Sequence, residues 1–350
     1  MIYGSYVSGF SEVSAMLRVA IVGSGKIGGK RAREVVRAPD ARLVAVVDER
    51  PERAEALAKL YGCRAGTNWR AVVSASDVDA VVVATTHEWL APITLEALKC
   101  HKHVLCEKPL AINAGQAHEV VKLAAINRRK LKTGFNHRHH PAVWRANDLA
   151  KSGAIGQILH IRCRYGHGGR SGYDREWRAD PLKSGGGELL DQGIHALDLF
   201  RWFLGDFQDI YAALSSAFWR MPVEDNAFCT LRTPSGQVAS LHASWTQWKN
   251  LFSFEVFGTD GYLAVEGLGG SYGTEKLVVG KRPAQFGRPE EQIAEYPGDD
   301  GSWAAEWTEF IEAIREDRRP LADGYDGWQA LRLVQAAYAS AREGRAIPLI

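Results

Sequence analysis

One glycine-rich turn near the amino end restricts this chain to a small group of folds. The apolar run at residues 17–22 leads directly into Gly23-Ser24-Gly25-Lys26-Ile27-Gly28, and a helical pattern then continues to Arg37. Glycines between a buried strand and a helix start let a pyrophosphate approach the backbone amides and the positive end of the helix. We therefore expect a dinucleotide site that uses Gly23, Gly25, Lys26, Ile27 and Gly28.

An acidic residue closes the next expected strand, at residues 43–47. Asp48 stands about 20 residues after Gly28, where a carboxylate can accept hydrogen bonds from both adenosine ribose hydroxyls and repel a 2′-phosphate. This placement favours NAD over NADP as the cofactor. Arg50 and Arg53 could instead approach a phosphate, although they also suit exposed positions at the start of an expected helix, residues 51–61.

The first half of the chain alternates strand and helix patterns, which predicts an α/β fold with a parallel, doubly wound Rossmann sheet. After His140-Pro141 the pattern changes to a helix up to Lys151, a strand, a glycine-hinged helix and several strands in series between residues 210 and 279. Strands in series favour a large, mostly antiparallel sheet in an α+β domain. Residues 281–301 suggest a surface loop, and a last helix is expected from Asp326 to Gly344.

The length of 350 residues exceeds what one hydrophobic core usually supports, so we expect separate domains. Residues 1–16 suggest a disordered tail, residues 17–138 an NAD(P)-binding domain, and residues 139–350 a domain for substrate binding and oligomerisation. The last helix can pack back on the first domain. An open sheet in the second domain suggests a homodimer or homotetramer.

Composition excludes several other classes of protein. A formal net charge of +2 gives no sign of a nucleic-acid partner, and no apolar run is long enough for a membrane span. The five cysteines form no Cys-x-x-Cys pair, so reduced thiols in the cytoplasm are expected. His137, His139 and His140, with His101 and His103, fit no ordinary zinc spacing, so no metal is expected.

Two later motifs carry candidate catalytic groups. Asp191 and His195 are four residues apart after Gly185-Gly186-Gly187, so on a helix the carboxylate could hold one imidazole nitrogen while the other faces a substrate. The alternative is a capped amphipathic helix that merely buries its apolar face. Lys108 follows an expected strand at residues 103–107, and Pro109 keeps it extended, so it should point into the crevice where dinucleotides lie.

Taken together, the glycine-rich turn, Glu107-Lys108-Pro109 and Asp191-x-x-x-His195 resemble the Gfo/Idh/MocA family of glucose-fructose oxidoreductases and inositol 2-dehydrogenases, over about residues 17–350. The resemblance implies that Lys108, Asp191 and His195 surround a substrate hydroxyl beside the nicotinamide, with Glu107 in the cofactor site. One departure is Thr86, where the family usually has proline, and another is Leu90, where it usually has histidine. Thr85, Thr86 and His87 are still expected near the cofactor.

A cluster of aromatic and arginine residues precedes the catalytic motif, and Tyr173, Trp177 and Arg178 there suit a sugar ring. The alternative is a strand with an exposed arginine face. Asn136 and Arg138 lie where the family crosses between domains and reaches the substrate. We therefore predict an NAD(P)-dependent oxidoreductase acting on a ring secondary alcohol of a sugar, a sugar derivative or a cyclitol, with a slight preference for anionic or nucleotide-linked sugars.

In this interpretation His195 would accept the hydroxyl proton while Lys108 hydrogen-bonds the same oxygen, and Lys108 stays the alternative for the principal base. Two other functions stay open. One is an enzyme that uses bound NAD transiently to cleave a glycoside, and the other is a transcriptional regulator that binds dinucleotide without catalysis. A regulator has no need to retain Lys108, Asp191 and His195 together.

Overall fold

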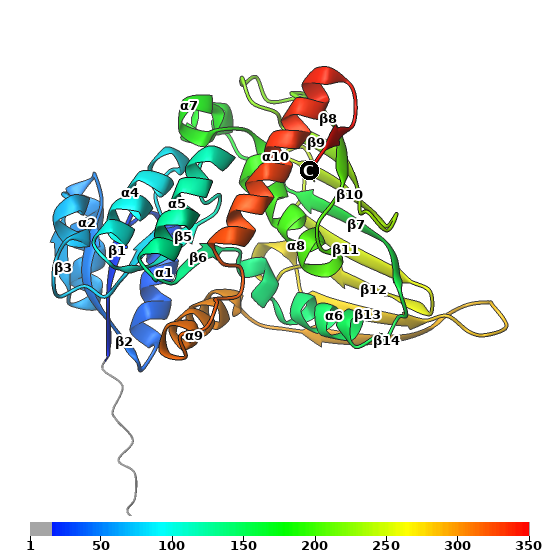
Figure 1. Ribbon diagram of the computed structural model, residues 1–350, viewed down its shortest axis with the longest axis horizontal. Coiled ribbons are helices and arrows are strands. Elements are labelled where there is room, and N and C mark those ends of the chain that lie inside the picture. Colours follow the sequence, from blue (N-terminus) through cyan, green and yellow to red (C-terminus); the bar gives the residue numbers. More distant parts are fainter. Residues whose placement is uncertain (1–15, 350) are drawn as a thin grey trace, which may run out of the picture.

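The computed structural model describes residues 16–349, so nearly all of the tail expected at residues 1–16 lies outside the described residues. Two sheets stand side by side along the long axis of the molecule (Figure 1). The first contains six parallel strands in the order β3-β2-β1-β4-β5-β6. Its strands are β1 (Leu17–Val22), β2 (Ala41–Val47), β3 (Arg64–Gly66), β4 (Ala80–Val83), β5 (His103–Glu107) and β6 (Leu131–Gly134).

Helices connect these strands, as the alternating pattern predicts. They are α1 (Lys26–Arg37), α2 (Pro51–Tyr61), α3 (Trp69–Val73), α4 (His87–Lys99) and α5 (Ala114–Ile126). The strand order reverses between β1 and β4, and ligands of such sheets bind in the crevice at this point, beyond the carboxyl ends of the strands. The glycine-rich turn after β1 and Lys108 after β5 both lie at these carboxyl ends.

The second sheet has nine strands in the order β14-β13-β12-β11-β7-β10-β9-β8-β15, all antiparallel except the β7–β10 pair. This confirms a mostly antiparallel sheet. The strands are β7 (Ile158–Gly166), β8 (Asp209–Ser215), β9 (Asn226–Arg232), β10 (Val238–Ser244), β11 (Leu251–Gly258), β12 (Gly261–Glu266), β13 (Glu275–Lys281), β14 (Glu290–Tyr296) and β15 (Ile347–Pro348).

Helices cover one face of this second sheet and leave the other face open (Figure 1). In β9, Cys229 and Leu231 are buried beneath the helices, whereas the alternate residues Phe228 and Thr230 are exposed. The remaining helices are α6 (Pro141–Lys151), α7 (Pro181–Ser184), α8 (Ile194–Leu204), α9 (Ser302–Arg315) and α10 (Gly324–Glu343).

The structure corrects two predicted boundaries. The expected loop at 281–301 contains strand β14, whose residues are nearly all exposed, so an edge strand here lacks the apolar alternation that reveals strands. The last helix begins earlier than Asp326, because Asp323 is its N-cap and accepts a hydrogen bond from the Asp326 amide. Gly344 ends it in the left-handed conformation, as expected.

Helix α10 contacts α5 and β6 of the first sheet and β8 of the second, so it joins the two halves (Figure 1). Buried ion pairs lie between the same halves. The Arg138 guanidinium donates to Asp198 at 2.6 and 2.8 Å and to Asp326 at 3.2 Å, and its side chain is buried. Lys132, also buried, pairs with Glu309 at 2.6 Å. The boundary between the two domains, which we place between residues 138 and 139, stays a prediction.

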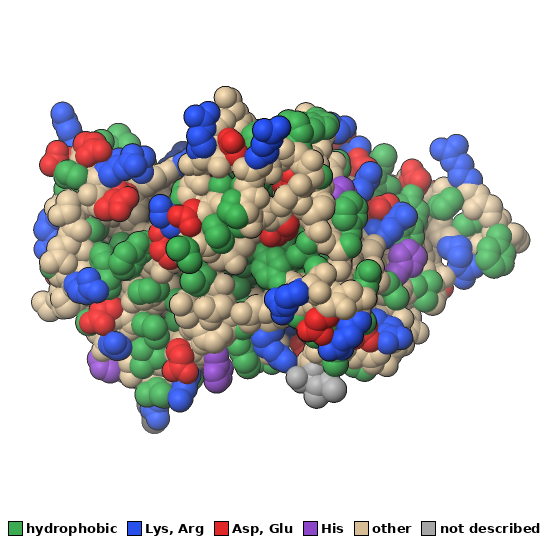
Figure 2. All heavy atoms as spheres, turned by 90° about the horizontal axis from the view of Figure 1, so that it is seen from above, with side chains coloured by type: hydrophobic (Ala, Val, Ile, Leu, Met, Phe, Trp, Pro, Cys, Tyr) green, Lys and Arg blue, Asp and Glu red, His purple; other side chains and the backbone are tan. Residues whose placement is uncertain are grey.

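Within residues 16–349, no helix combines the length and apolar character needed to cross a membrane. Figure 2 shows Lys and Arg side chains interspersed with Asp and Glu over one face, without a broad field of a single charge. This distribution matches the small formal net charge of the chain.

Candidate active site

The glycine-rich turn is packed too tightly for larger residues at two of its positions. Gly23 has φ +97°, and an added Cβ would lie 2.4 Å from the carbonyl oxygen of Ala84. A Cβ at Gly28 would lie 1.8 Å from the carbonyl oxygen of Gly23. Gly25, in contrast, faces open space, and α1 begins directly after it without a side-chain cap. The uncapped amides of the first turn therefore fit a dinucleotide pyrophosphate.

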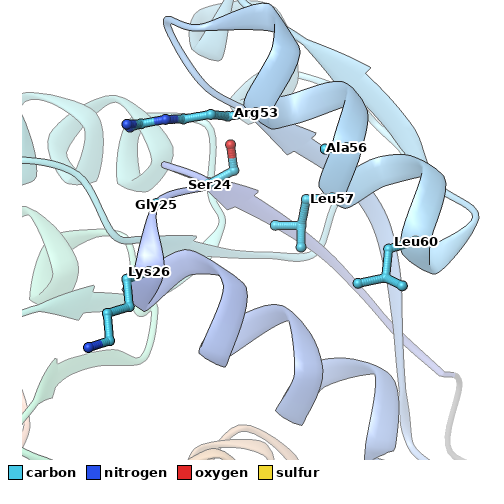
Figure 3. A pocket seen from close by; sticks show the side chains of 7 residues that line it. All are labelled: Ser24, Gly25, Lys26, Arg53, Ala56, Leu57 and Leu60. Atoms are coloured by element: carbon cyan, nitrogen blue, oxygen red, sulfur yellow. The ribbon is translucent and has the colours of Figure 1, made fainter.

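Asp48 ends β2 beside this turn. Its Oδ2 accepts hydrogen bonds from the Ser24 amide at 2.7 Å and the Ser24 hydroxyl at 3.1 Å, and its Oδ1 accepts from the Arg50 amide at 3.0 Å. Each carboxylate oxygen can accept more than one bond, so capacity remains for ribose hydroxyls. A pocket of about 460 Å³ opens next to the turn, and Figure 3 shows Arg53 and Leu57 projecting into it from α2.

Asp191 lies between two cations from different parts of the chain. The Lys108 ammonium donates to Asp191 Oδ1 at 2.9 Å and to the Asp191 carbonyl oxygen, and Arg178 Nε donates to Oδ2 at 2.8 Å. Burial opposes ionisation of this carboxyl, but the charges of Lys108 and Arg178 outweigh it and hold the pKa of Asp191 well below its usual range. Asp191 therefore carries a negative charge that fixes both cations.

The expectation that Asp191 forms a hydrogen bond with His195 is wrong. Among the described residues neither imidazole nitrogen of His195 has a protein partner, and Nδ1 is buried. Residues Leu189–Gly193 form a π-helical turn before α8, and its wider spacing changes the relative direction of side chains four residues apart. Both carboxylate oxygens of Asp191 are also taken by Lys108 and Arg178.

A second histidine positions His195 instead. The His137 and His195 rings stack with their centroids 3.8 Å apart, and Phe135 packs edge-on against His195 at 5.7 Å. His137 Nδ1 donates to Asn136 Oδ1 at 3.2 Å, so its Nε2 accepts from the Tyr165 hydroxyl at 3.0 Å. Burial, reinforced by the Lys108 charge, lowers the pKa of His195 well below its usual value and keeps its ring neutral.

His87 lies beside the ion pair of Lys108 and Asp191. Its Nδ1 donates to the carbonyl oxygen of Ser184 at 2.8 Å, and its Nε2 lies 3.9 Å from Asp191 Oδ1. Trp177 packs edge-on against the ring at 4.7 Å. Burial lowers the pKa of His87 to about 3, so the ring is neutral. We expected this residue near the cofactor, and its contacts place it beside Asp191 and Trp177.

Some of the other expected site residues have hydrogen-bond or ion-pair partners inside the protein, and others do not. Tyr173 is buried against Trp245 and Trp219, and its hydroxyl makes no hydrogen bond to the described residues. Thr85 and Thr86 form the turn before α4. In contrast, Asn136 donates to Ser302 Oγ at 2.8 Å, and Glu107 pairs with buried Arg31 at 2.6 Å, so both have internal partners.

Arg138 is enclosed by the Asp198 and Asp326 carboxylates, which gives it a structural role between the halves of the chain instead of a free substrate-binding group. His137 is the residue whose role the sequence analysis missed. Its neighbours Asn136 and Arg138 are expected to reach the substrate, but nothing in the sequence indicates that His137 stacks on His195, 58 positions away.

A glycine-rich turn with the Asp48 carboxylate beside it, at the switch point of a Rossmann sheet and next to a cluster of lysine, aspartate and histidine, is typical of an NAD-binding oxidoreductase. Residues 17–135 match the model of the oxidoreductase family with an NAD-binding Rossmann fold, and residues 143–264 match that of the GFO/IDH/MocA C-terminal domain. The chain belongs to this family.

Known proteins of similar length resemble the chain along most of its course. It is 28% identical to inositol 2-dehydrogenase from Rhizobium meliloti over 349 residues, covering 95% of this chain and 99% of that protein. It is 30% identical to 1,5-anhydro-D-fructose reductase from Ensifer adhaerens, covering 95% and 98%. A levoglucosan dehydrogenase solved with NADH shares the fold with a TM-score of 0.88 and 23% identity, covering 95% and 99%.

Proposed function

We propose that this protein is an NAD-dependent dehydrogenase that oxidises a ring secondary alcohol of a sugar or cyclitol. The observation that carries the proposal is the Lys108 ammonium, bound to Asp191 at 2.9 Å, at the edge of the sheet that also carries the glycine-rich turn. An ammonium held there can hydrogen-bond the reacting oxygen and stabilise negative charge on it. The neutral His195 ring can accept the hydroxyl proton.

Bound NAD would supply the hydride acceptor. The residues that we propose to hold it are Gly23, Gly25, Lys26, Ile27, Gly28, Asp48, Arg50, Thr85 and Thr86. Glu107, which we expected in the same site, is paired with Arg31 at 2.6 Å. Asp191 positions the Lys108 ammonium and the Arg178 guanidinium, which differs from the role in holding His195 that we first expected. Trp177 and Arg178 border the same cluster and, together with Tyr173, would contact the rest of the sugar ring.

An uncharged substrate fits this site better than the anionic sugar that the arginine cluster first suggested. Arg162 pairs with Glu255 at 3.1 Å, Arg170 pairs with Glu176 at 2.6 Å, and Arg178 pairs with Asp191. These cations therefore already have carboxylate partners. The names of the relatives, which include inositol, levoglucosan and 1,5-anhydro-D-fructose enzymes, also support neutral polyols.

A substrate panel tests the proposal directly. Purified protein with NAD is mixed with myo-inositol, levoglucosan, free pyranoses, sugar acids, nucleotide sugars and aliphatic alcohols, and NADH absorbance is followed. We expect turnover of at least one neutral ring polyol. Turnover confined to aliphatic alcohols or 2-hydroxy acids contradicts the proposal.

We also propose that the protein is a homodimer or homotetramer in the cytoplasm. The open face of the nine-stranded sheet supports pairing with a second copy, because Tyr211 and Phe228 are about half exposed there. All five cysteines are free thiols, as expected in a reducing compartment.

A further inference from the structure

Glu188 is a buried carboxyl group that no contact inside the protein explains. Its side chain is completely buried, and neither Oε1 nor Oε2 has a hydrogen-bond partner among the described residues. Nearly all buried carboxyls in proteins are hydrogen-bonded or paired, because an unpaired one loses its interactions with water without replacement. The unpaired Glu188 carboxyl therefore needs a hydrogen-bond partner from outside the protein chain.

The backbone around Glu188 is firmly held, so the missing partners do not reflect a loose segment. The Glu188 amide donates to the carbonyl oxygen of Glu224 at 3.0 Å. The Glu224 carboxylate accepts from the amides of Gly187 and Leu189, both at 3.0 Å, and from the Tyr338 hydroxyl at 3.0 Å. Glu224 thus fixes the main chain on both sides of Glu188 and leaves the Glu188 side chain unpaired.

The surroundings of Glu188 belong to the candidate active site. Lys108, Asp191 and Arg178 are close enough for their charges to act on this carboxyl. The hydroxyls of Tyr165, Tyr173 and Tyr272 also lie within electrostatic range of the Glu188 carboxyl. Glu188 also precedes Asp191 by three residues, so its carboxyl lies within electrostatic range of the ion pair of Lys108 and Asp191.

Gln192, four residues later, has a second unpaired acceptor. Its Nε2 donates to the Tyr272 hydroxyl at 3.1 Å, which fixes the amide, while its Oε1 is buried without a partner. Glu188 and Gln192 together present three buried oxygens without donors. Such oxygens require O–H or N–H groups from outside the protein.

We propose that Glu188 and Gln192 bind hydroxyl groups of an uncharged polyol ring, at carbons other than the one that is oxidised. This inference rests on the proposed function. Burial, reinforced by the charge of Asp191, raises the pKa of Glu188 well above its usual value, so the neutral carboxyl can donate one hydrogen bond as well as accept others. A hydroxyl both donates and accepts, whereas a sugar carboxylate or phosphate would meet three oxygens that offer it at most one proton.

The test compares Glu188→Met and Glu188→Gln with the wild-type protein, each loaded with NADH. Affinity for myo-inositol and for levoglucosan is measured by calorimetry, and thermal unfolding without polyol is recorded. We expect Glu188→Met to weaken polyol binding about tenfold or more, since a hydrogen bond to a ligand is lost. Glu188→Gln, which keeps a donor and an acceptor, should lose less, and NADH affinity should stay unchanged.

The two variants should also unfold at a higher temperature than the wild type, because an unpaired buried acid is removed. Glu224→Gln is the matched control. It disrupts a partly buried glutamate with internal partners and should lower the unfolding temperature. A purely structural Glu188 would behave like Glu224, with a lower unfolding temperature and unchanged polyol affinity.

The outcomes separate this inference from the proposed function. If the wild type binds a polyol and Glu188→Met binds it equally well, the role of Glu188 is wrong and the proposed function stands. If the wild type binds neither myo-inositol nor levoglucosan nor any other neutral ring polyol of the substrate panel, both the neutral-polyol function and the role of Glu188 are overturned.

Discussion

The imidazole of His195 stacks on that of His137, with centroids 3.8 Å apart and planes inclined by 20°. Both rings are buried, and burial lowers the pKa of each well below its usual value. Two neutral rings can stack closely, whereas two imidazolium ions at this distance would repel each other. The orientation of the proposed base therefore depends on a neighbouring ring that hydrogen bonds to Tyr165 and Asn136 hold in place.

We predict that His137→Ala lowers kcat by about tenfold to a hundredfold, because small displacements of a catalytic group cost this much. His137→Phe keeps a stacking surface and should lose less. Steady-state kinetics on the substrate found in the panel provide the measurement. Equal losses for both variants would show that the hydrogen bonds of His137, and not its stacked ring, position His195.

Lys108→Met and His195→Ala should each lower turnover by about 10² or more, the usual scale for losing an electrostatic or acid-base group. Cofactor affinity, measured by NADH fluorescence titration, should be largely kept. Near-normal turnover in His195→Ala would refute its role as the base.

Asp191→Asn should lower both turnover and the free energy of unfolding. The change leaves Lys108 and Arg178 without their shared negative partner, and an unsatisfied buried group costs about 1–3 kcal/mol. Urea unfolding measures the stability effect. Asp180→Asn, which changes an exposed pair with Lys183, is a control and should have little effect on turnover.

We expect NAD to bind more tightly than NADP, because the Asp48 carboxylate beside Ser24 should pair with ribose hydroxyls and oppose a phosphate. Asp48→Ala should reduce this preference, whereas Glu49→Ala, at the adjacent exposed position, should preserve it. Titration of each protein with NAD and with NADP measures the two affinities. Tighter NADP binding by the wild type would mean that Arg50 or Arg53 dominates.

His87 should make the protein less stable in acid. The folded state keeps the ring neutral down to a pKa of about 3, whereas the unfolded chain takes up a proton below about 6.5. The unfolded state thus binds more protons, and stability falls as the pH drops through this window, by up to about 1.4 kcal/mol per pH unit.

His87→Gln, whose amide can still donate to Ser184, should show a shallower loss of stability between pH 7 and pH 5 in urea unfolding. His101→Gln, at an exposed position, should retain the wild-type slope. An unchanged slope in His87→Gln would indicate that His87 is protonated in the folded state.

Phe228→Glu should lower the molecular mass in solution if the open sheet face pairs with a second copy, because burying a carboxylate there is costly. Leu182→Glu, at a highly exposed position on α7, is the matched control. Light scattering after gel filtration measures the mass. A monomeric wild type would contradict the proposed oligomer.

Regular local patterns made much of the fold predictable. Strand β5 and helices α2 and α6 have the expected bounds, because apolar period and proline positions act over a few residues. The partners of Asp191 were not predictable. They depend on Lys108, 83 positions earlier, and on a π-helical turn that no local pattern indicated. The same limit applies to Glu188, whose significance lies in the absence of partners among residues 16–349.

The carboxylate of Asp191 takes one cation from the end of β5 and another from the segment before α7. A chimera that combines the Rossmann half of one relative with the second half of another would therefore inherit Lys108 from one parent and Arg178, Asp191 and the π-helical turn from the other. Such a hybrid can fold well and still misplace its lysine. Recombination between relatives should succeed most often when Lys108 and residues 177–195 come from the same parent.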